Sequence, residues 1–268
     1  MICYNRHEVI NVSILYWNID KKIIAGTSLR MGGVSQPPYD SLNVGLYVAD
    51  DPDNVRKNRE IIANEIKVPL TQWVFPKITH SDHFYKVTSK DIGKGAFNEA
   101  NSIFDVDALY TDEPNIAIAI FHADCVPVLL YCPSKNLVGA IHAGWAGTIK
   151  QITSKLVHHW IEHEQCDPND IYAYIGPSLS QANFEVKMDV ICLVKEKSPE
   201  LLPYLDFKKD DLAFMDAVGM NRYQLNKHGV LDKNITIIHE CTFDNPDKYF
   251  CFRRFPVTGR HLSFIYQK

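Results

Sequence analysis

The residues of this chain that could do chemistry gather in two short polar segments in the middle of the sequence. His122-Ala-Asp-Cys125 separates two apolar stretches, and His142-Ala-Gly-Trp145 follows a third. Zinc binds thiolate and imidazole ligands at about 2.0–2.3 Å, and a catalytic zinc site uses three protein ligands and keeps one position open. Cys125 and His142 are therefore candidate ligands of a catalytic zinc ion.

The apolar stretches around these segments have the length and composition of buried strands. We expect strands at Ile116–Phe121, Val126–Tyr131 and Leu137–His142, with a tight turn before the third. If the last two strands pair as a hairpin, the side chains of Cys125 and His142 can reach one point. Functional groups are well held at strand ends, because the sheet fixes them while one side stays open.

A third metal ligand must come from elsewhere in the chain. His80, His83, His122 and His239 are the candidates, and His80, which closes the extended segment 73–79, is the first choice. Spacing alone does not separate this metal site from two alternatives. One is a Cys–His pair that acts as nucleophile and base without a metal, and the other is a buried cysteine and histidine with purely structural roles.

The rest of the sequence predicts alternating strands and helices, the pattern of an α/β or α+β fold with mixed sheets. Apolar residues at helical spacing predict helices at Val55–Ile66, Ile149–His163, Lys187–Lys197 and Met215–Lys227. Neither an internal repeat nor a long Pro-, Gly- or Ser-rich linker divides the chain. We therefore expect a single domain over residues 1–268.

The composition excludes several classes of protein. Of the 268 residues, 46% are hydrophobic and 22% are charged, which is typical of a water-soluble globule with a large core. A net charge of −4 favours neither nucleic acid nor an anionic membrane as a partner. The longest apolar stretch, 116–132, contains His122, Asp124 and Pro127, whereas a membrane span needs about 20 apolar residues. With no signal-peptide core and no CxxC pair, we expect a cytoplasmic protein with reduced cysteines.

At these same residues the sequence resembles the laccase-domain family, which is also described as multicopper polyphenol oxidase or purine nucleoside phosphorylase and has a peptidoglycan-editing branch. The similarity covers nearly the whole chain and implies a layered α/β/β/α sandwich with mixed sheets. The motifs that carry it are His122-Ala-Asp-Cys-Val-Pro-Val-Leu-Leu, Ala140-Ile-His-Ala-Gly-Trp-Ala-Gly-Thr, Ile175-Gly-Pro-Ser, Arg30-x-Gly-Gly-Val-Ser, Asn58-Arg59, Cys241-Thr242, Phe252-Arg-Arg and Thr258-Gly-Arg.

The resemblance implies that His80, Cys125 and His142 hold one zinc ion with an open fourth position. It also implies phosphorolysis of inosine, guanosine or adenosine, in which nucleoside and phosphate give the free base and ribose 1-phosphate. Adenosine deamination and methylthioadenosine cleavage would take place in the same site. The expected partners are purine nucleosides and phosphate, and the expected state is a monomer or a homodimer.

Phosphorolysis requires a phosphate held beneath the glycosidic carbon and a stabilised leaving base. Guanidinium groups bind phosphate through paired N–H donors, so Arg30, Arg59 and Arg253, which stand beside glycines or within family motifs, are candidates for substrate binding. Asp124 and His122 are candidates to donate a proton to the leaving base.

Two other functions are consistent with the same residues. Cys125 could be a nucleophile with His142 as its base, in an amidase that edits cell-wall peptidoglycan precursors. The chain could also be a non-catalytic interaction protein stabilised by a zinc ion with a fourth protein ligand. Copper is not expected as the native metal, because a multicopper oxidase needs histidine pairs for several coppers and no His-x-His occurs among the 11 histidines.

Overall fold

The computed structural model describes residues 13–209 and 211–268. The N-terminal segment, from which we expect no signal peptide, lies largely outside these residues. The helices are α1 (Pro52–Glu65), α2 (Trp145–Ile149), α3 (Ile152–Glu162), α4 (Met188–Lys197) and α5 (Ala217–Asn226). The strands are β1 (Ile14–Tyr16), β2 (Ile23–Ser28), β3 (Trp73–Val74), β4 (Pro76–Lys77), β5 (Phe84–Lys86), β6 (Ile103–Phe104), β7 (Ala108–Thr111), β8 (Ala117–His122), β9 (Val126–Cys132), β10 (Leu137–Ala143), β11 (Tyr172–Ile175), β12 (Glu185–Lys187), β13 (Leu205–Lys209), β14 (Leu212–Met215), β15 (Ile235–Ile237) and β16 (His261–Gln267).

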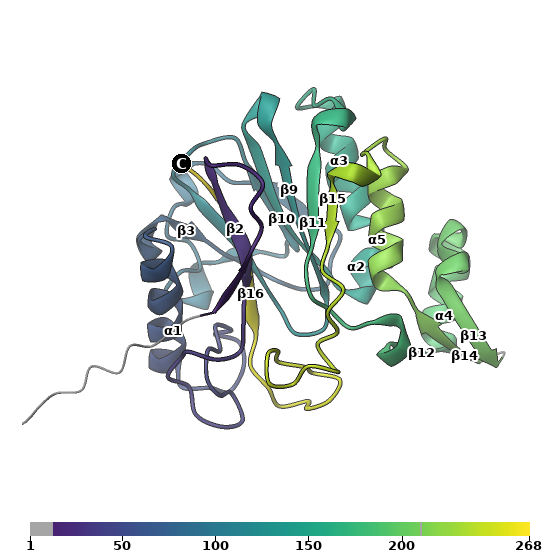
Figure 1. Ribbon diagram of the computed structural model, residues 1–268, viewed down its shortest axis with the longest axis horizontal. Helices are drawn as coiled ribbons and strands as arrows, with labels where there is room; N and C mark the ends of the chain where they lie inside the picture. Colours follow the sequence, from purple (N-terminus) through teal and green to yellow (C-terminus); the bar gives the residue numbers. More distant parts are fainter. Residues whose placement is uncertain (1–12, 210) are drawn as a thin grey trace, which may run out of the picture.

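Two mixed sheets pack face to face in the middle of the molecule (Figure 1). The first has the strand order β1-β2-β16-β8-β3, and the second has the order β15-β11-β9-β10-β7-β5. β3, β5 and β15 run parallel to their neighbours, and the other pairs in these two sheets are antiparallel. The core between the sheets contains side chains of both, such as Ile118 and Ile265 from the first and Leu129 and Ala140 from the second.

Helices cover the outer face of each sheet. Ile62 of α1 belongs to the same buried cluster as Phe264 of the five-stranded sheet. On the six-stranded sheet, Leu156 and Trp160 of α3 pack against Leu130 with side chains of α5. Figure 1 shows α1 on one side of the two sheets and α2, α3 and α5 on the other. The layered α/β/β/α sandwich is therefore confirmed, whereas one domain over residues 1–268 stays a prediction.

The local sequence explains where the helices begin. Asp51 precedes Pro52 at the start of α1, and its side chain accepts a hydrogen bond from the Asp53 N–H. Asp216 caps α5 in the same way by accepting from the Gly219 N–H. Among the described residues, no helix is long and apolar enough to cross a membrane.

Two predictions about elements were incomplete. The helix expected at 149–163 begins later, as α3 at Ile152, because Gln151 has a left-handed backbone with φ of 63°; Ile149 instead ends the short helix α2. The apolar residues keep helical spacing on both sides of Gln151, so their pattern does not reveal the change in backbone angle at that residue. The central strand β16 was not predicted at all, because His261, Ser263 and Gln267 interrupt its apolar residues; all three are buried.

Candidate metal centre and its cavity

The hairpin expected from the sequence brings Cys125 and His142 together. β9 and β10 pair in antiparallel register from Cys132 and Leu137 at the turn to Val126 and Ala143 at the open end. Cys125 directly precedes β9 and His142 lies near the end of β10, so both side chains reach the same edge of the sheet.

His80 approaches this edge from a separate segment after β4. One ligand atom each from His80, Cys125 and His142 lie within 4.8 Å of one another, and within the described residues this is the only such group of three or more His, Cys, Asp or Glu residues. The two imidazole rings are nearly perpendicular, with centroids 5.0 Å apart. Gly144 leaves the space for them, because a Cβ there would lie 3.0 Å from His80 and 3.2 Å from His142. A nitrogen, sulfur, nitrogen donor set is one that zinc accepts.

The carboxylate of Asp107, a residue that the sequence interpretation missed, positions two members of the cluster. Its oxygens accept hydrogen bonds from the backbone N–H groups of Thr79, His80 and Ser81 at 3.1, 3.1 and 2.8 Å. The same side chain is 2.7 Å from Nδ1 of His142. A carboxylate on one imidazole nitrogen orients the other toward a metal, so Nε2 of His142 is the nitrogen left for the ion.

The electrostatics of the cluster favour a thiolate. Burial raises the pKa of the Cys125 thiol, but His142 and His80 lower it by more, from its ordinary value of 9.0 to about 6. Burial lowers the pKa of His142, but Cys125 and Asp107 outweigh this and raise it to about 10. At neutral pH the metal-free pair is therefore a thiolate beside an imidazolium, and the thiolate is the form of cysteine that binds metals.

A cavity of about 280 Å³ opens beside the cluster. Tyr47 and Phe252, which are 44% and 50% exposed, form aromatic walls, and the guanidinium of Arg260 lies 5.6 and 5.7 Å from their ring centres. The full lining is Tyr47, Ile78, His80, Phe121, His122, Ala123, Cys125, His142, Phe252 and Arg260. The cavity thus combines the cluster, apolar walls and one guanidinium.

Residues 24–268 match the sequence profile of the family described as "Multi-copper polyphenol oxidoreductase laccase". The chain belongs to this family. It is 41% identical over 252 residues to "Purine nucleoside phosphorylase YlmD" of Bacillus subtilis, covering 93% of this chain and 90% of that one. It is 33% identical over 256 residues to "Purine nucleoside phosphorylase" of Haemophilus influenzae, covering 93% and 96% of the two chains.

Two crystal structures share this fold of the laccase family. Hypothetical protein YfiH of Bacillus licheniformis superposes with a TM-score of 0.92 at 35% sequence identity, over 99% of this chain and 100% of that one. YlmD of Geobacillus stearothermophilus superposes with a TM-score of 0.88 at 36% identity, over 92% and 93% of the two chains. The likeness therefore covers both sheets and the segments that carry the cluster.

The three arginines expected to bind substrate bond to groups outside the cavity. The Arg30 guanidinium donates to the Asp40 carboxylate and to two backbone carbonyls. Arg59 is buried between the rings of Phe75 and Phe121 and donates to three backbone carbonyls. Arg253 donates to a backbone carbonyl of β12. None of the three lines the cavity as the structure describes it, and their role in substrate binding stays a prediction.

Asp124 also points away from the cavity lining. It is buried, with a left-handed backbone of φ 83°. One carboxylate oxygen accepts from the Thr242 hydroxyl and the other from the Arg253 N–H, both at 2.6 Å. These contacts tie the loop before Cys125 to the C-terminal segment, and the catalytic role of Asp124 stays a prediction.

His122 and Arg260 are the further polar residues that the structure places in the cavity. His122 was a candidate from the sequence. Arg260 follows Gly259 in the Thr258-Gly-Arg motif, and its place beside a glycine suits an anion-binding arginine, but it was not among the three arginines expected to bind substrate. Packing distinguishes these arginines, because Arg59 is buried whereas Arg260 lies against the exposed rings of Tyr47 and Phe252. The sequence alone does not show this difference.

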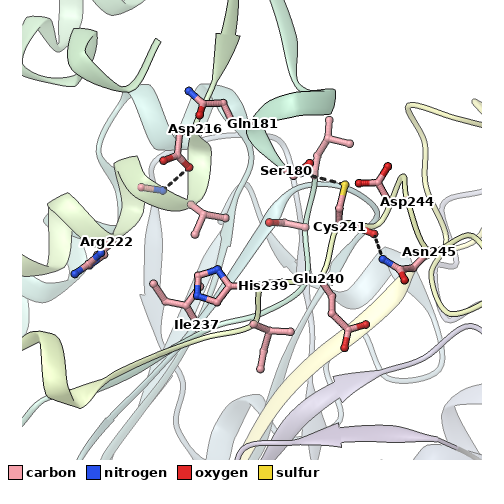
Figure 2. Close-up of a pocket in the computed structure, with 15 residues that line it drawn as sticks. Ser180, Gln181, Asp216, Arg222, Ile237, His239, Glu240, Cys241, Asp244 and Asn245 are labelled. Atoms are coloured by element: carbon pink, nitrogen blue, oxygen red, sulfur yellow. Dashed lines mark hydrogen bonds between the residues drawn. The ribbon is translucent and has the colours of Figure 1, made fainter. Parts of the chain in front are cut away.

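Two of the histidines considered as third ligands lie away from the cluster. His83 is exposed and bonds to Asp105 at 3.1 Å. His239 lines a different cavity, of about 480 Å³. Figure 2 shows His239 there together with Cys241, whose sulfur accepts a hydrogen bond from the Ser180 N–H. Only His80 of these three histidines joins Cys125 and His142.

Proposed function

We propose that this chain is a zinc-dependent purine nucleoside phosphorylase. It would convert inosine, guanosine or adenosine and phosphate into the free base and ribose 1-phosphate. The observation that carries the proposal is the cluster of His80, Cys125 and His142 beside an aromatic cavity. The names of the relatives at 41% and 33% identity support the same reaction.

The cluster fits zinc by its donor chemistry. Cys125 supplies a thiolate, and His142 supplies Nε2 because Asp107 occupies its Nδ1. Zinc held by these residues and His80 would supply a Lewis acid with one open position. The description of the family mentions copper, but the described residues contain no second cluster of the kind that a multicopper oxidase needs.

The residues of the chain itself would bind and orient the substrates. Tyr47 and Phe252 present ring faces at the cavity on which a purine can stack, a contact worth about 1–3 kcal/mol for a base on an aromatic side chain. Apolar Ile78 and Phe121 also line the cavity and would contact the apolar parts of a bound nucleoside. The expectation that His122 donates a proton to the leaving base stays a prediction from the sequence.

We extend the proposal to adenosine deaminase and methylthioadenosine phosphorylase activities in the same cavity. Both take a purine nucleoside, so the same stacking walls and the same cluster would serve them. A cytoplasmic location and a monomeric or homodimeric state stay predictions from the sequence.

The direct test is the release of hypoxanthine from inosine by the zinc-loaded protein, with and without phosphate. Release that depends on phosphate, with ribose 1-phosphate as the second product, is expected. Cys125→Ala should abolish both zinc binding and release. Cys192→Ala removes an exposed thiol on α4 and is the matched control. Normal turnover by a metal-free Cys125→Ala protein would overturn the proposal.

One observation favours a second function. Cys125, His142 and Asp107 form the order nucleophile, base and orienting carboxylate that a cysteine amidase uses. In that case the metal-free protein would hydrolyse an amide of a peptidoglycan precursor. Stoichiometric alkylation of Cys125 would remove this amidase activity and leave phosphorolysis intact, whereas the phosphorylase proposal expects alkylation of Cys125 to abolish phosphorolysis.

A further inference from the structure

The imidazole of His122 has one ring nitrogen in use and one free. The side chain is 1% exposed and lines the cavity. Its Nε2 lies 2.8 Å from the hydroxyl of Ser263. Its Nδ1 is buried and has no hydrogen-bond partner within the described part of the chain. Unpartnered buried polar atoms are rare in native proteins, and because His122 lines the cavity, a ligand bound there is a candidate partner for Nδ1.

A chain of buried hydroxyl groups decides which nitrogen of His122 carries the proton. The Ser263 hydroxyl lies 2.8 Å from that of Thr27, which lies 3.3 Å from the phenol of Tyr174. All three side chains are fully buried. Three hydrogen bonds join the neutral imidazole of His122 to these three hydroxyl groups in a row. The four groups carry four polar hydrogens, so one hydrogen at an end of the row is not used in a bond.

The remaining hydrogen is on Nδ1 of His122 or on the Tyr174 hydroxyl. If Nε2 donates to Ser263, every hydroxyl must pass its hydrogen onward, and the Tyr174 hydrogen has no acceptor among the described residues. If Tyr174 donates to Thr27 instead, each hydroxyl donates once, and Nε2 accepts from Ser263. The second arrangement leaves no buried hydroxyl unpartnered, and it places the ring proton on Nδ1. His122 is neutral in this state, since burial and nearby His261 hold its pKa well below the ordinary value.

Arg260 places a second donor at the same cavity. One of its terminal nitrogens donates to the carbonyls of Thr258 and Gly259, and the guanidinium also interacts with the phenol of Tyr47, while the remaining N–H groups have no other acceptor in the described chain. None of the residues that line the cavity in the described structure is an Asp or a Glu. Free donors without a nearby carboxylate favour an anionic ligand.

We propose that the Nδ1–H of His122 and the guanidinium of Arg260 together bind the phosphate of the reaction. This inference rests on the proposed function, which supplies phosphate as the second substrate. It makes Ser263, Thr27 and Tyr174 positioning residues, because they hold His122 as a donor and do not touch the ligand.

Two amide variants of His122 separate its nitrogens. The amide of Gln can reach the position of Nε2 and keep the Ser263 contact, whereas the amide of Asn stands near Nδ1. Binding of inorganic phosphate to the zinc-loaded protein without nucleoside is measured by titration. A hydrogen bond to a charged ligand contributes about 1.5–3 kcal/mol, so His122→Gln should weaken phosphate binding roughly 10- to 100-fold. His122→Asn should stay within a few-fold of wild type, and equal affinity of His122→Gln and wild type would overturn the proposal.

The positioning role has a readout that does not need a His122 variant to fold. ¹⁵N NMR of the ring should show a proton on Nδ1 in the wild-type protein and a mixture of tautomers in Tyr174→Phe. The same change should weaken phosphate binding by roughly twofold, as the binding-competent tautomer falls to about half. A proton on Nε2 in the wild type would refute the hydroxyl argument. Phosphate binding without hypoxanthine release would instead refute only the proposed function.

Discussion

Replacing Asp107 by Asn tests the central feature of the candidate site. The side chains of Asp and Asn have the same shape, but the amide of Asn has one acceptor oxygen whereas the carboxylate of Asp has two. One oxygen of Asp107 accepts three hydrogen bonds, two from Ser81 and one from Thr79. The other accepts from the His80 N–H and lies 2.7 Å from His142 Nδ1. The amide oxygen should stay with the three donors, so the NH₂ group faces His80 and His142.

The magnitude follows from these two contacts. In the metal-free protein both the His80 N–H and the protonated Nδ1 of His142 lose the carboxylate, and one hydrogen bond to a charged group is worth about 1.5–3 kcal/mol, so the free energy of unfolding should fall by at least that amount. His142 can recover its bond only by accepting from the amide at Nδ1. Its proton then sits on Nε2, the nitrogen that must bind zinc. Loss of such an orienting carboxylate typically weakens metal binding about 10- to 100-fold.

The assay is zinc content after equilibration with a competing chelator, together with calorimetric unfolding of the metal-free protein. Asp105→Asn is the matched control on the same loop, because Asp105 is partly exposed and contacts Thr79 and His83 but no member of the cluster. The control should bind zinc as wild type does. If Asp107→Asn also binds zinc with wild-type affinity, then Asp107 does not set the tautomer of His142 and the argument fails.

Three further outcomes follow from the same geometry. Gly144→Ala places a methyl group 3.0, 3.2 and 3.4 Å from atoms of His80, His142 and Cys125, so zinc affinity measured against a chelator should fall; unchanged affinity would mean that the ligands can move apart freely. In metal-free Cys192→Ala protein, alkylation of Cys125 by iodoacetamide should rise with pH through about 6 instead of 9, since the thiolate reacts and the thiol does not; a midpoint near 9 would contradict the thiolate–imidazolium pair. Chelation of the metal should lower both the melting temperature and phosphate-dependent hypoxanthine release, and added zinc should restore both, because a ligand that binds only the folded state stabilises it; loss of melting temperature alone would support the non-catalytic zinc protein instead.

Local patterns were sufficient for the part of the site that lies on consecutive strands. The apolar stretches that became β9 and β10, with a short turn between them, predicted a hairpin with Cys125 and His142 at its open end, and the structure confirms that pairing. His80 was the first choice for the third member from its place after an extended segment, the resemblance to the family implied the same residue, and the structure places it beside the other two.

Contacts between distant segments could not be predicted in this way. Asp107 precedes a strand and looks like any acidic loop residue, yet folding buries it beneath His80 and His142. β16 contains His261 and Ser263, polar residues that appear wrong for a central strand until their partners on β2 and β8 are present. Burial of polar groups depends on partners supplied by other segments, and periodicity carries no information about them.

The sequence by itself therefore determined a fold of alternating strands and helices with mixed sheets and the hairpin that joins Cys125 and His142, because strand and turn signals are local. The resemblance to the family added the layered sandwich and the expectation that His80, Cys125 and His142 bind a metal. Only the tertiary structure decided that Asp107 orients the cluster, that Arg59 is enclosed by aromatic rings, and that Arg260 and His122 share the cavity. All arginines have the same charge, so the sequence cannot rank them as ligands of a substrate. The tertiary structure decides this, because it determines which guanidinium groups already bond to protein acceptors and which one faces the cavity.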